Sequence, residues 1–386
     1  DGMSIRVQSC CGAAIYSDVA QDPLHVVQSA RIASLYVEQN GLSSAIYEPE
    51  MEVSDERLRQ LEEELRTAFL GESGLQLFLQ PQVEALPEMK DCFSEDLGNL
   101  DAIRKQVLVE KHLISREQAA KAGGSAAVIN RDQSLSIMIN EEDHLRMQSI
   151  RSGLDLRAAF ATLDRVDSEL ENLVPYAYDQ RYGYLTACPT NLGTGMRASA
   201  MLHLPGLVLS EQVNQVISAV NKIGLAVRGL YGEGTEALAN LFQISNQHTL
   251  GERELDIIAR LERVIEQIIT HEQNARRKLI EDQPHKVLDH VGRAYATLRF
   301  AHILESKEAL THLSMLRMGS DLGMLPPGEG KMIDTLLVEI QPAHLQIAAQ
   351  RKLNAGERDI LRAEVLRRKL ANLPEPITDI ATGPPP

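Results

Sequence analysis

The sequence predicts an α+β fold, in which a sheet carries helices packed on its faces. Two observations lead to this prediction. Short β-like runs separated by helical patterns occupy residues 103–250, and a long helical pattern follows at residues 252–279. Hydrophobic residues make up 44% of the 386 residues, so the chain can bury a substantial core. At ~150 residues per domain, the length predicts two or three domains.

The first 98 residues are expected to form a small, mostly helical N-terminal lobe. Residues 54–70 have helical periodicity, because four apolar side chains share one face: Leu58, Leu61, Leu65 and Phe69. Ser54 is a suitable N-cap for this helix. Two prolines between residues 80 and 87 indicate a linker or a turn after it.

The sheet is expected within residues 99–282. Its β-like runs are Val107–Val109, Leu135–Ile139, Met201–Leu204, Leu225–Arg228 and Leu241–Ser245. In the second run, three apolar residues alternate with Ser136 and Met138. This alternation predicts a strand with one deeply buried face.

Helical patterns lie between and after these runs. Residues 213–223 carry an apolar stripe, with Ser210 as the expected N-cap and Gly224 just past the expected end. Residues 252–279 predict one long helix with an apolar face.

A helical C-terminal domain is expected from residue 283 to residue 386. Its helical patterns are interrupted by a loop at residues 322–330, which is rich in glycine and proline. A strongly charged helix is expected at residues 357–370, and a disordered tail at residues 382–386.

The acidic balance of the chain argues against two classes of partner. The sequence holds 39 Lys and Arg against 54 Asp and Glu, a net charge of −15, whereas nucleic acids and anionic membranes both require a basic surface. An acidic protein suits a cationic substrate instead. The four cysteines form neither a zinc site nor a disulfide scaffold, and we see no transmembrane run or signal peptide, so we expect a cytoplasmic protein.

Three segments in the sheet-containing region combine an arginine with acidic or flexible residues. They read Asn-Glu-Glu-Asp-His-Leu-Arg at 140–146, Cys-Pro-Thr-Asn-Leu-Gly-Thr-Gly-Met-Arg-Ala-Ser at 188–199, and Val-Arg-Gly-Leu-Tyr-Gly-Glu-Gly at 227–234. Taken singly, each reads more readily as a solvated arginine, an acidic loop or a buried cysteine. No Walker loop, protein-kinase motif or nucleophile elbow accompanies them.

Taken together, the three segments suggest transfer of a phosphoryl group to a cation. Their arginines are Arg146, Arg197 and Arg228, and a planar guanidinium pairs bidentately with phosphate oxygens. Glu142 and Glu233 would supply two carboxylates opposite this anion-binding wall. A carboxylate pair can orient a cationic acceptor and accept its proton.

The first two segments resemble signatures of the phosphagen (guanidino) kinase superfamily. Three further stretches resemble its bacterial protein-arginine kinase branch: residues 108–115, 184–188 and 232–238. The resemblance is strong over residues 100–280 and weaker in the C-terminal region. It implies the phosphagen-kinase fold, with an antiparallel sheet flanked by helices.

The resemblance also implies the activity and its catalytic residues. The reaction would be the in-line transfer of the γ-phosphoryl group of ATP to arginine side chains of proteins. Glu142 and Glu233 would hold the target guanidinium, with Glu142 as the catalytic base. Cys188 would pack against the guanidinium as a thiolate.

The implied nucleotide site has one departure from the family pattern. Arg146, Arg197 and Arg228 would bind the phosphates of ATP together with Mg²⁺, and no residue is assigned as a metal ligand. Family members also carry a Ser-Arg-x-Arg stretch near the N-terminus, to which residues 26–36 correspond. Only Arg31 remains there, and Ala33 stands at the position of the second arginine. Each missing contact would remove ~1.5–3 kcal/mol of phosphate binding.

The C-terminal segment Glu-Arg-Asp-Ile-Leu-Arg at residues 357–362 resembles the phosphoarginine-binding element of the family. Arg358 would bind the phosphate and Asp359 the guanidinium, in a domain that dimerises. The resemblance further implies an activator protein and a Clp-type unfoldase or protease as partners. On the residues alone, the segment reads equally well as a charged surface helix.

Two further functions stay open at this point. A degenerate kinase could act as a phosphoarginine-binding regulatory module, as the incomplete arginine motif suggests. A small-molecule guanidino kinase is disfavoured, because the stretches at 184–188 and 232–238 and the C-terminal extension match the protein kinase branch.

Overall fold

The computed structural model describes residues 11–13, 44–46, 76–121, 123–229 and 237–378. The chain falls into two compact units, Asp1–Leu75 and Gln76–Pro386. In the first unit the described residues form two short parallel strands, β1 (Cys11–Ala13) and β2 (Ser44–Ile46). The predicted helix at residues 54–70 and the predicted tail at 382–386 lie outside the described residues.

The first sheet of the second unit contains the strand predicted at Leu135–Ile139. Among the described residues its antiparallel order is β3-β4-β5-β6. The strands are β3 (Phe93–Asp96), β4 (Ala126–Ile129), β5 (Leu135–Ile139) and β6 (Leu145–Ser149). The prediction of one buried face is wrong, because both faces of β5 are covered. Ser136 is only 1% exposed and donates its hydroxyl to the carbonyl of Leu113, 2.6 Å away, while Met138 packs into an apolar cluster.

Helices cover this sheet, and two sequence predictions fail among them. The helices are α3 (Gln76–Glu84), α4 (Ala102–Glu110), α5 (Arg116–Ala120) and α6 (Leu156–Glu171). The predicted linker at residues 80–87 is wrong at its start, because α3 continues through Pro81 at the expense of one backbone hydrogen bond. The predicted strand Val107–Val109 is wrong as well. Asp101 caps α4 by accepting the backbone N–H groups of Ile103 and Arg104, each at 2.9 Å, and the valines continue this helix.

The second sheet confirms three predicted strands. Among the described residues its antiparallel order is β10-β11-β9. The strands are β9 (Ser199–His203), β10 (Leu225–Gly229) and β11 (Leu241–Asn246). A separate hairpin pairs β7 (Tyr178–Asp179) with β8 (Gly183–Tyr184). This unit also contains short 3₁₀ turns: η1 (Pro87–Met89), η2 (Leu97–Asn99), η3 (Pro189–Asn191) and η4 (Leu238–Asn240).

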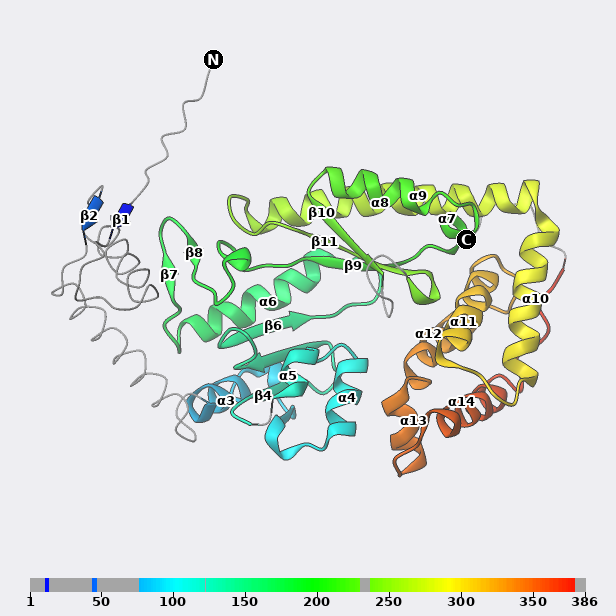
Figure 1. The fold of residues 1–386 in the computed structure, drawn as a ribbon, viewed down its shortest axis with the longest axis horizontal. Helices are drawn as coiled ribbons and strands as arrows, with labels where there is room; N and C mark the ends of the chain where they lie inside the picture. The colour runs from blue at the N-terminus through cyan, green and yellow to red at the C-terminus, as the bar shows by residue number, and fades with distance from the viewer. Residues whose placement is uncertain (1–10, 14–43, 47–75, 122, 230–236, 379–386) are drawn as a thin grey trace, which may run out of the picture. The chain divides into compact units, whose positions relative to one another are not determined.

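Three helices pack against the second sheet and form a core with it. They are α7 (Pro205–Leu209), α8 (Val213–Lys222) and α9 (Glu254–Asp282), which is the predicted long helix (Figure 1). The stripe of α8 and its stop at Gly224, which has a φ of +77°, are confirmed. The expected N-cap is wrong, because the Ser210 hydroxyl donates to the Gly206 carbonyl, 2.7 Å away, and Gln212 takes the N-cap position.

The predicted C-terminal helices are confirmed and enclose a core of their own. They are α10 (Pro284–Phe300), α11 (Ser306–Asp321), α12 (Glu329–Glu339), α13 (Pro342–Ala349) and α14 (Ala355–Lys369) (Figure 1). Asn354 and Glu357 form a capping box at the start of α14. Residues 76–378 belong to one compact unit, so the domain boundaries at residues 98 and 282 stay predictions. No helix in the described part of the chain is both long and apolar enough to cross a membrane.

Candidate active site

The segment between β5 and β6 presents Glu142 to solvent and buries its neighbour. The backbone N–H of Asn140 donates to the carbonyl of His144, 2.9 Å away, and closes a turn in which Asn140 has a φ of +54°. Asparagine tolerates this left-handed conformation better than most residues. Glu141 is 6% exposed, whereas Glu142 is exposed. We call residues 140–144 the base loop.

Glu141 holds the base loop and a predicted phosphate-binding residue in one arrangement. Its Oε1 atom accepts the Ser115 hydroxyl at 2.5 Å and lies 3.2 Å from Nη1 of Arg146. Its Oε2 atom accepts the backbone N–H of Glu142 at 2.8 Å. Burial raises the pKa of the Glu141 carboxyl, but the Ser115 and Glu142 hydrogen bonds and the Arg146 charge outweigh burial and hold this pKa below its usual value. Glu141 is therefore an ionised anchor within the base loop.

A second contact joins the base loop to the Cys188 segment. The Oδ1 atom of Asp143 accepts the backbone N–H of Ala187 at 2.6 Å. Cys188 follows directly and is half-buried, with its Sγ atom 3.0 Å from the Thr190 hydroxyl. Either the thiol or the hydroxyl can be the donor in this contact. The structure thus links the base loop and the Cys188 segment, which are separated by more than 40 residues of sequence.

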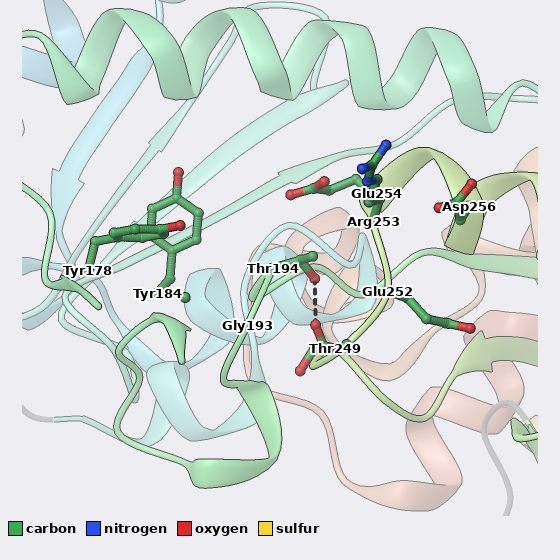
Figure 2. Close-up of a pocket in the computed structure, with 11 residues that line it drawn as sticks. Tyr178, Tyr184, Gly193, Thr194, Thr249, Glu252, Arg253, Glu254 and Asp256 are labelled. Carbon is green, nitrogen blue, oxygen red and sulfur yellow. Dashed lines mark hydrogen bonds between the residues drawn. The ribbon is translucent and has the colours of Figure 1, made fainter. Parts of the chain in front are cut away.

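The Cys188 segment is in turn fixed to the residues after β11. The backbone N–H of Thr194 donates to the Thr249 carbonyl at 3.0 Å, and the Thr194 hydroxyl donates to the same oxygen at 3.2 Å (Figure 2). Gly193 has a φ of +100°, and a Cβ atom there would collide with the Thr249 carbonyl, so only glycine fits this crossing. The Asn246 side chain accepts the backbone N–H of Ala198 at 2.8 Å. These bonds set the backbone on both sides of Arg197.

The three predicted phosphate-binding arginines lie close enough for their charges to interact. Arg146 lies on β6, Arg228 on β10, and Arg197 just before β9. All three side chains are exposed. Desolvation lowers the pKa of the Arg197 guanidinium, and the positive charges of Arg228 and Arg146 lower it further. A concentrated positive charge of this kind, in a chain with a net charge of −15, is suited to a polyphosphate.

A cavity of about 620 Å³ adjoins the Cys188 segment at Gly193 and Thr194. Figure 2 shows Tyr178 and Tyr184 on one side of this cavity and acidic side chains from the start of α9 on the other. The tyrosine rings meet edge to face, with their centroids 5.3 Å apart. Glu254 and Asp256 lie in the first turn of α9, where negative charge stabilises the helix N-terminus. Their negative charge therefore has a structural role.

The remaining predicted site residues lie elsewhere or outside the described chain. Glu233 and Arg31 fall among the residues that the structure does not describe. Arg358 and Asp359 lie on α14, where the Nη1 atom of Arg358 donates to the Leu353 carbonyl at 2.9 Å. Asp359 accepts Nη1 of the buried Arg362 at 2.6 Å. No group of three or more His, Cys, Asp or Glu residues in the described ranges could hold a metal ion.

Sequence reasoning overlooked three residues of this site. Glu141 and Asp143 lie inside the quoted 140–146 segment, yet only Glu142 and Arg146 were given roles. Ser115 ends the 108–115 stretch, which was used only as a mark of the family branch. The available signal was their place in the motifs, and their function becomes visible only through the contacts described above.

Two family models match the chain. Residues 82–275 match the ATP:guanido phosphotransferase C-terminal catalytic domain, and residues 284–380 match the protein-arginine kinase McsB C-terminal domain. Both matches fall within the unit that begins at Gln76.

Curated relatives carry the name protein-arginine kinase. The relative from Pelotomaculum thermopropionicum is 49% identical over 278 residues, which cover 72% of this chain and 78% of the relative. The relative from Syntrophomonas wolfei is 45% identical over 302 residues, covering 78% and 84% respectively.

Solved structures give a weaker likeness. The duplicated taurocyamine kinase from Schistosoma mansoni aligns with a TM-score of 0.47 at 25% identity, covering 54% of this chain and 30% of that chain. A lombricine kinase aligns with a TM-score of 0.45 at 26% identity, covering 52% and 58%.

Proposed function

Because this chain belongs to the protein-arginine kinases of the ATP:guanido phosphotransferase family, we propose that it transfers the γ-phosphoryl group of ATP to arginine side chains of proteins. The observation that carries the proposal is the Glu141 anchor. One buried carboxylate holds both the backbone of Glu142 and the guanidinium of Arg146. This shared anchor supports the proposal that Glu142 acts on the acceptor while Arg146 binds the donor.

The arginines account for the donor side of the reaction. Arg146, Arg197 and Arg228 bind the phosphates of ATP by charge-assisted hydrogen bonds. Desolvation, and then the charges of Arg228 and Arg146, lower the pKa of Arg197, and a bound anion offsets both effects. Because negative charge is spread over the transferring phosphoryl oxygens, the same guanidinium groups stabilise the transition state.

Glu142 and Cys188 account for the acceptor side. A protonated guanidinium with a pKa above ~12 is a poor nucleophile, so a base must accept its proton as the nitrogen–phosphorus bond forms. Glu142 takes this role, and Glu233 is the second carboxylate that holds the guanidinium. Cys188 packs against the same acceptor, and its Sγ atom is oriented by the contact with the Thr190 hydroxyl. The Asp143 bond to Ala187 keeps the base loop and the cysteine together.

Mg²⁺ enters this scheme with the nucleotide. The described residues offer no cage of acidic ligands, and Mg²⁺ in kinase sites is bound largely by substrate phosphates and water. When bound, it neutralises phosphate charge. The residues of this chain position the phosphates and the acceptor around it.

The C-terminal helices support a regulatory proposal. Arg358 and Asp359 are consecutive on α14 and both are partly exposed, and we propose that they bind phosphoarginine through its phosphate and its guanidinium, respectively. A homodimer, an activator protein and a Clp-type unfoldase or protease are the partners of this proposal. A cytoplasmic location fits the ATP substrate and the unpaired thiols of Cys92 and Cys188.

One experiment tests the kinase against the binding module. The protein is incubated with Mg-ATP labelled in its γ-phosphate and an arginine-rich protein, and acid-labile label on the protein is counted. We expect labelling by the wild type and its loss in Glu142→Gln, which keeps the shape of the side chain without its basicity. Tight phosphoarginine binding by calorimetry, with no ATP binding and no labelling, would support the degenerate module instead.

A further inference from the structure

The side chain of Glu110 bridges two parts of the chain that are far apart in sequence. Glu110 is the last residue of α4 and is 6% exposed. Its Oε1 atom accepts the backbone N–H of Ala343 at 2.9 Å. Its Oε2 atom accepts the backbone N–H of His344 at 3.2 Å and lies 2.7 Å from Nδ1 of the His344 ring.

These contacts cap α13 from outside its own segment. Pro342 occupies the first turn and has no N–H, and the N-cap residue Gln341 makes no side-chain cap. Glu110 therefore satisfies the next two N–H groups of the helix, where a negative charge is favourable. Helices α4 and α13 lie side by side at this contact (Figure 1).

The connector that follows Glu110, residues 111–115, is attached to the first sheet along its length. The carbonyl of His112, whose φ is +59°, accepts the Gln148 side chain of β6 at 2.5 Å. The carbonyl of Leu113 accepts the Ser136 hydroxyl of β5 at 2.6 Å. A left-handed conformation at a residue other than glycine persists only where the surroundings determine it. The connector is therefore held in one shape by its neighbours.

The connector ends beneath the base loop. Ser115 is the N-cap of α5 and donates its hydroxyl to Glu141, the anchor of Glu142 and Arg146. Lys121, just past the end of α5, adds a second support by donating to the carbonyls of Asn140, at 2.6 Å, and Glu141. The connector thus joins Glu110, which caps α13, to Ser115, which donates to the anchor of Glu142.

From this juxtaposition we propose that Glu110 is a positioning residue for the reaction, which sets the base loop through the connector and Ser115 and makes that setting depend on α13. The inference rests on the proposed kinase function. It gives the 108–115 stretch a physical role, because its glutamate and its serine are the two ends of the link.

The link also reaches α14. Gln346 of α13 accepts the backbone N–H of Leu353 at 3.1 Å through Oε1, and the Leu353 carbonyl accepts Nη1 of Arg358. A displacement of Leu353 would therefore alter its hydrogen bonds to both Gln346 of α13 and Arg358 of α14. The C-terminal helices are therefore connected to Glu142 by hydrogen bonds at both ends of the connector and by the connector's own backbone between them.

A double-mutant cycle on the full chain tests the link. Glu110→Gln keeps the side-chain shape but removes the charge and one acceptor, and Ser115→Ala removes the hydroxyl bond to Glu141. We expect each variant to lower kcat at least tenfold with KM for ATP changed less than twofold. Because both act on one link, the double variant is expected to be no slower than the slower single variant. The matched control is Glu117→Gln, an exposed glutamate of α5, with unchanged kcat.

Hydrogen exchange of the backbone amides gives a readout that does not depend on activity. In Glu110→Gln we expect faster exchange in α13 and also in the base loop. Faster exchange in α13 alone, or a lowered melting temperature with unchanged kcat, would show a merely structural cap and overturn the inference. Effects on kcat that multiply in the double variant would overturn it as well. A third outcome separates the two proposals. If Glu110→Gln speeds exchange in both α13 and the base loop but the wild-type protein forms no phosphoarginine, the proposed function is refuted and the link is not.

Discussion

Asp143→Ala tests whether the base loop and the Cys188 segment must be held together for catalysis. Among the residues that the structure describes, the substitution removes the 2.6 Å hydrogen bond from the backbone N–H of Ala187 to the Asp143 carboxylate. The Glu141 anchor does not involve Asp143, so Glu142 and Arg146 keep their support. The change therefore isolates the link between the base and the cysteine.

The size of the effect follows from the type of bond. A hydrogen bond to a charged group contributes ~1.5–3 kcal/mol, and each 1.4 kcal/mol corresponds to a factor of about 10 in an equilibrium constant. Asp143 is partly exposed, which places the contribution at the lower end of this range. We expect kcat to fall by up to about tenfold, because the equilibrium constant for the arrangement that joins the base loop to the Cys188 segment falls by about that factor. Asp143→Asn keeps an acceptor oxygen, so its decrease in log kcat should be less than half of the decrease in Asp143→Ala.

The assay is the initial rate of ADP release with saturating Mg-ATP and an arginine-rich protein, compared between variants of equal folded content. Asp132→Ala is the control, because Asp132 lies in the turn between β4 and β5 and its hydrogen bonds stay within that turn, to Ser134 and Asn130. Its kcat should stay within twofold of the wild type. If Asp143→Ala leaves kcat unchanged while melting normally, the link is not needed for catalysis and the reasoning is refuted.

Three further predictions concern other parts of the molecule. Arg197→Lys removes bidentate phosphate recognition, so KM for ATP should rise by about one to two orders of magnitude in steady-state assays. Burial, and then the charge of Arg276, lower the pKa of His203 to about 3, below the usual 6.5. Between these two pH values the unfolded state binds more protons than the folded state. The free energy of unfolding should therefore rise with pH across this range, by up to ~1.4 kcal/mol per pH unit. His203→Gln should flatten this slope, measured by urea unfolding followed by circular dichroism. Arg358→Ala should weaken phosphoarginine binding at least tenfold in calorimetry.

Each of these predictions has a matched control on an exposed side chain of the same type. Arg131→Lys, His285→Gln and Arg368→Ala should leave nucleotide KM, the pH slope and phosphoarginine affinity unchanged, respectively. An unaltered KM in Arg197→Lys would remove that arginine from the nucleotide site. A pH slope that persists without His203 would assign it to another group, and equal phosphoarginine affinity in both Arg358→Ala and Arg368→Ala would place that ligand elsewhere.

The strands that the sequence predicted correctly are those whose pattern is continuous and long enough to exclude a helix. The runs at Leu135–Ile139 and Leu241–Ser245 became β5 and β11. The run Val107–Val109 misled, because three residues with β propensity cannot outweigh a helix that Asp101 caps. Pro81 misled for the opposite reason, since a short helix tolerates one proline where the surrounding packing holds it.

The residues of the candidate site that lie within the sequence motifs could be predicted. Arg146, Arg197 and Arg228 were recognised from their segments, and their charges do interact in the structure. The hydrogen bonds that hold the site residues in place could not be predicted, because most of them join residues that are far apart in the sequence. The capping of α13 by Glu110 joins residues 233 positions apart, and no local pattern marks Glu110 as different from a surface glutamate.

The most direct test of the central claim is to locate the transferred phosphate by tandem mass spectrometry under neutral conditions. After reaction with Mg-ATP and an arginine-rich protein, the account predicts phosphate on arginine side chains, lost after mild acid treatment and absent with Glu142→Gln. Phosphate found only on serine, threonine or a small guanidino compound, with none on protein arginine, would contradict it.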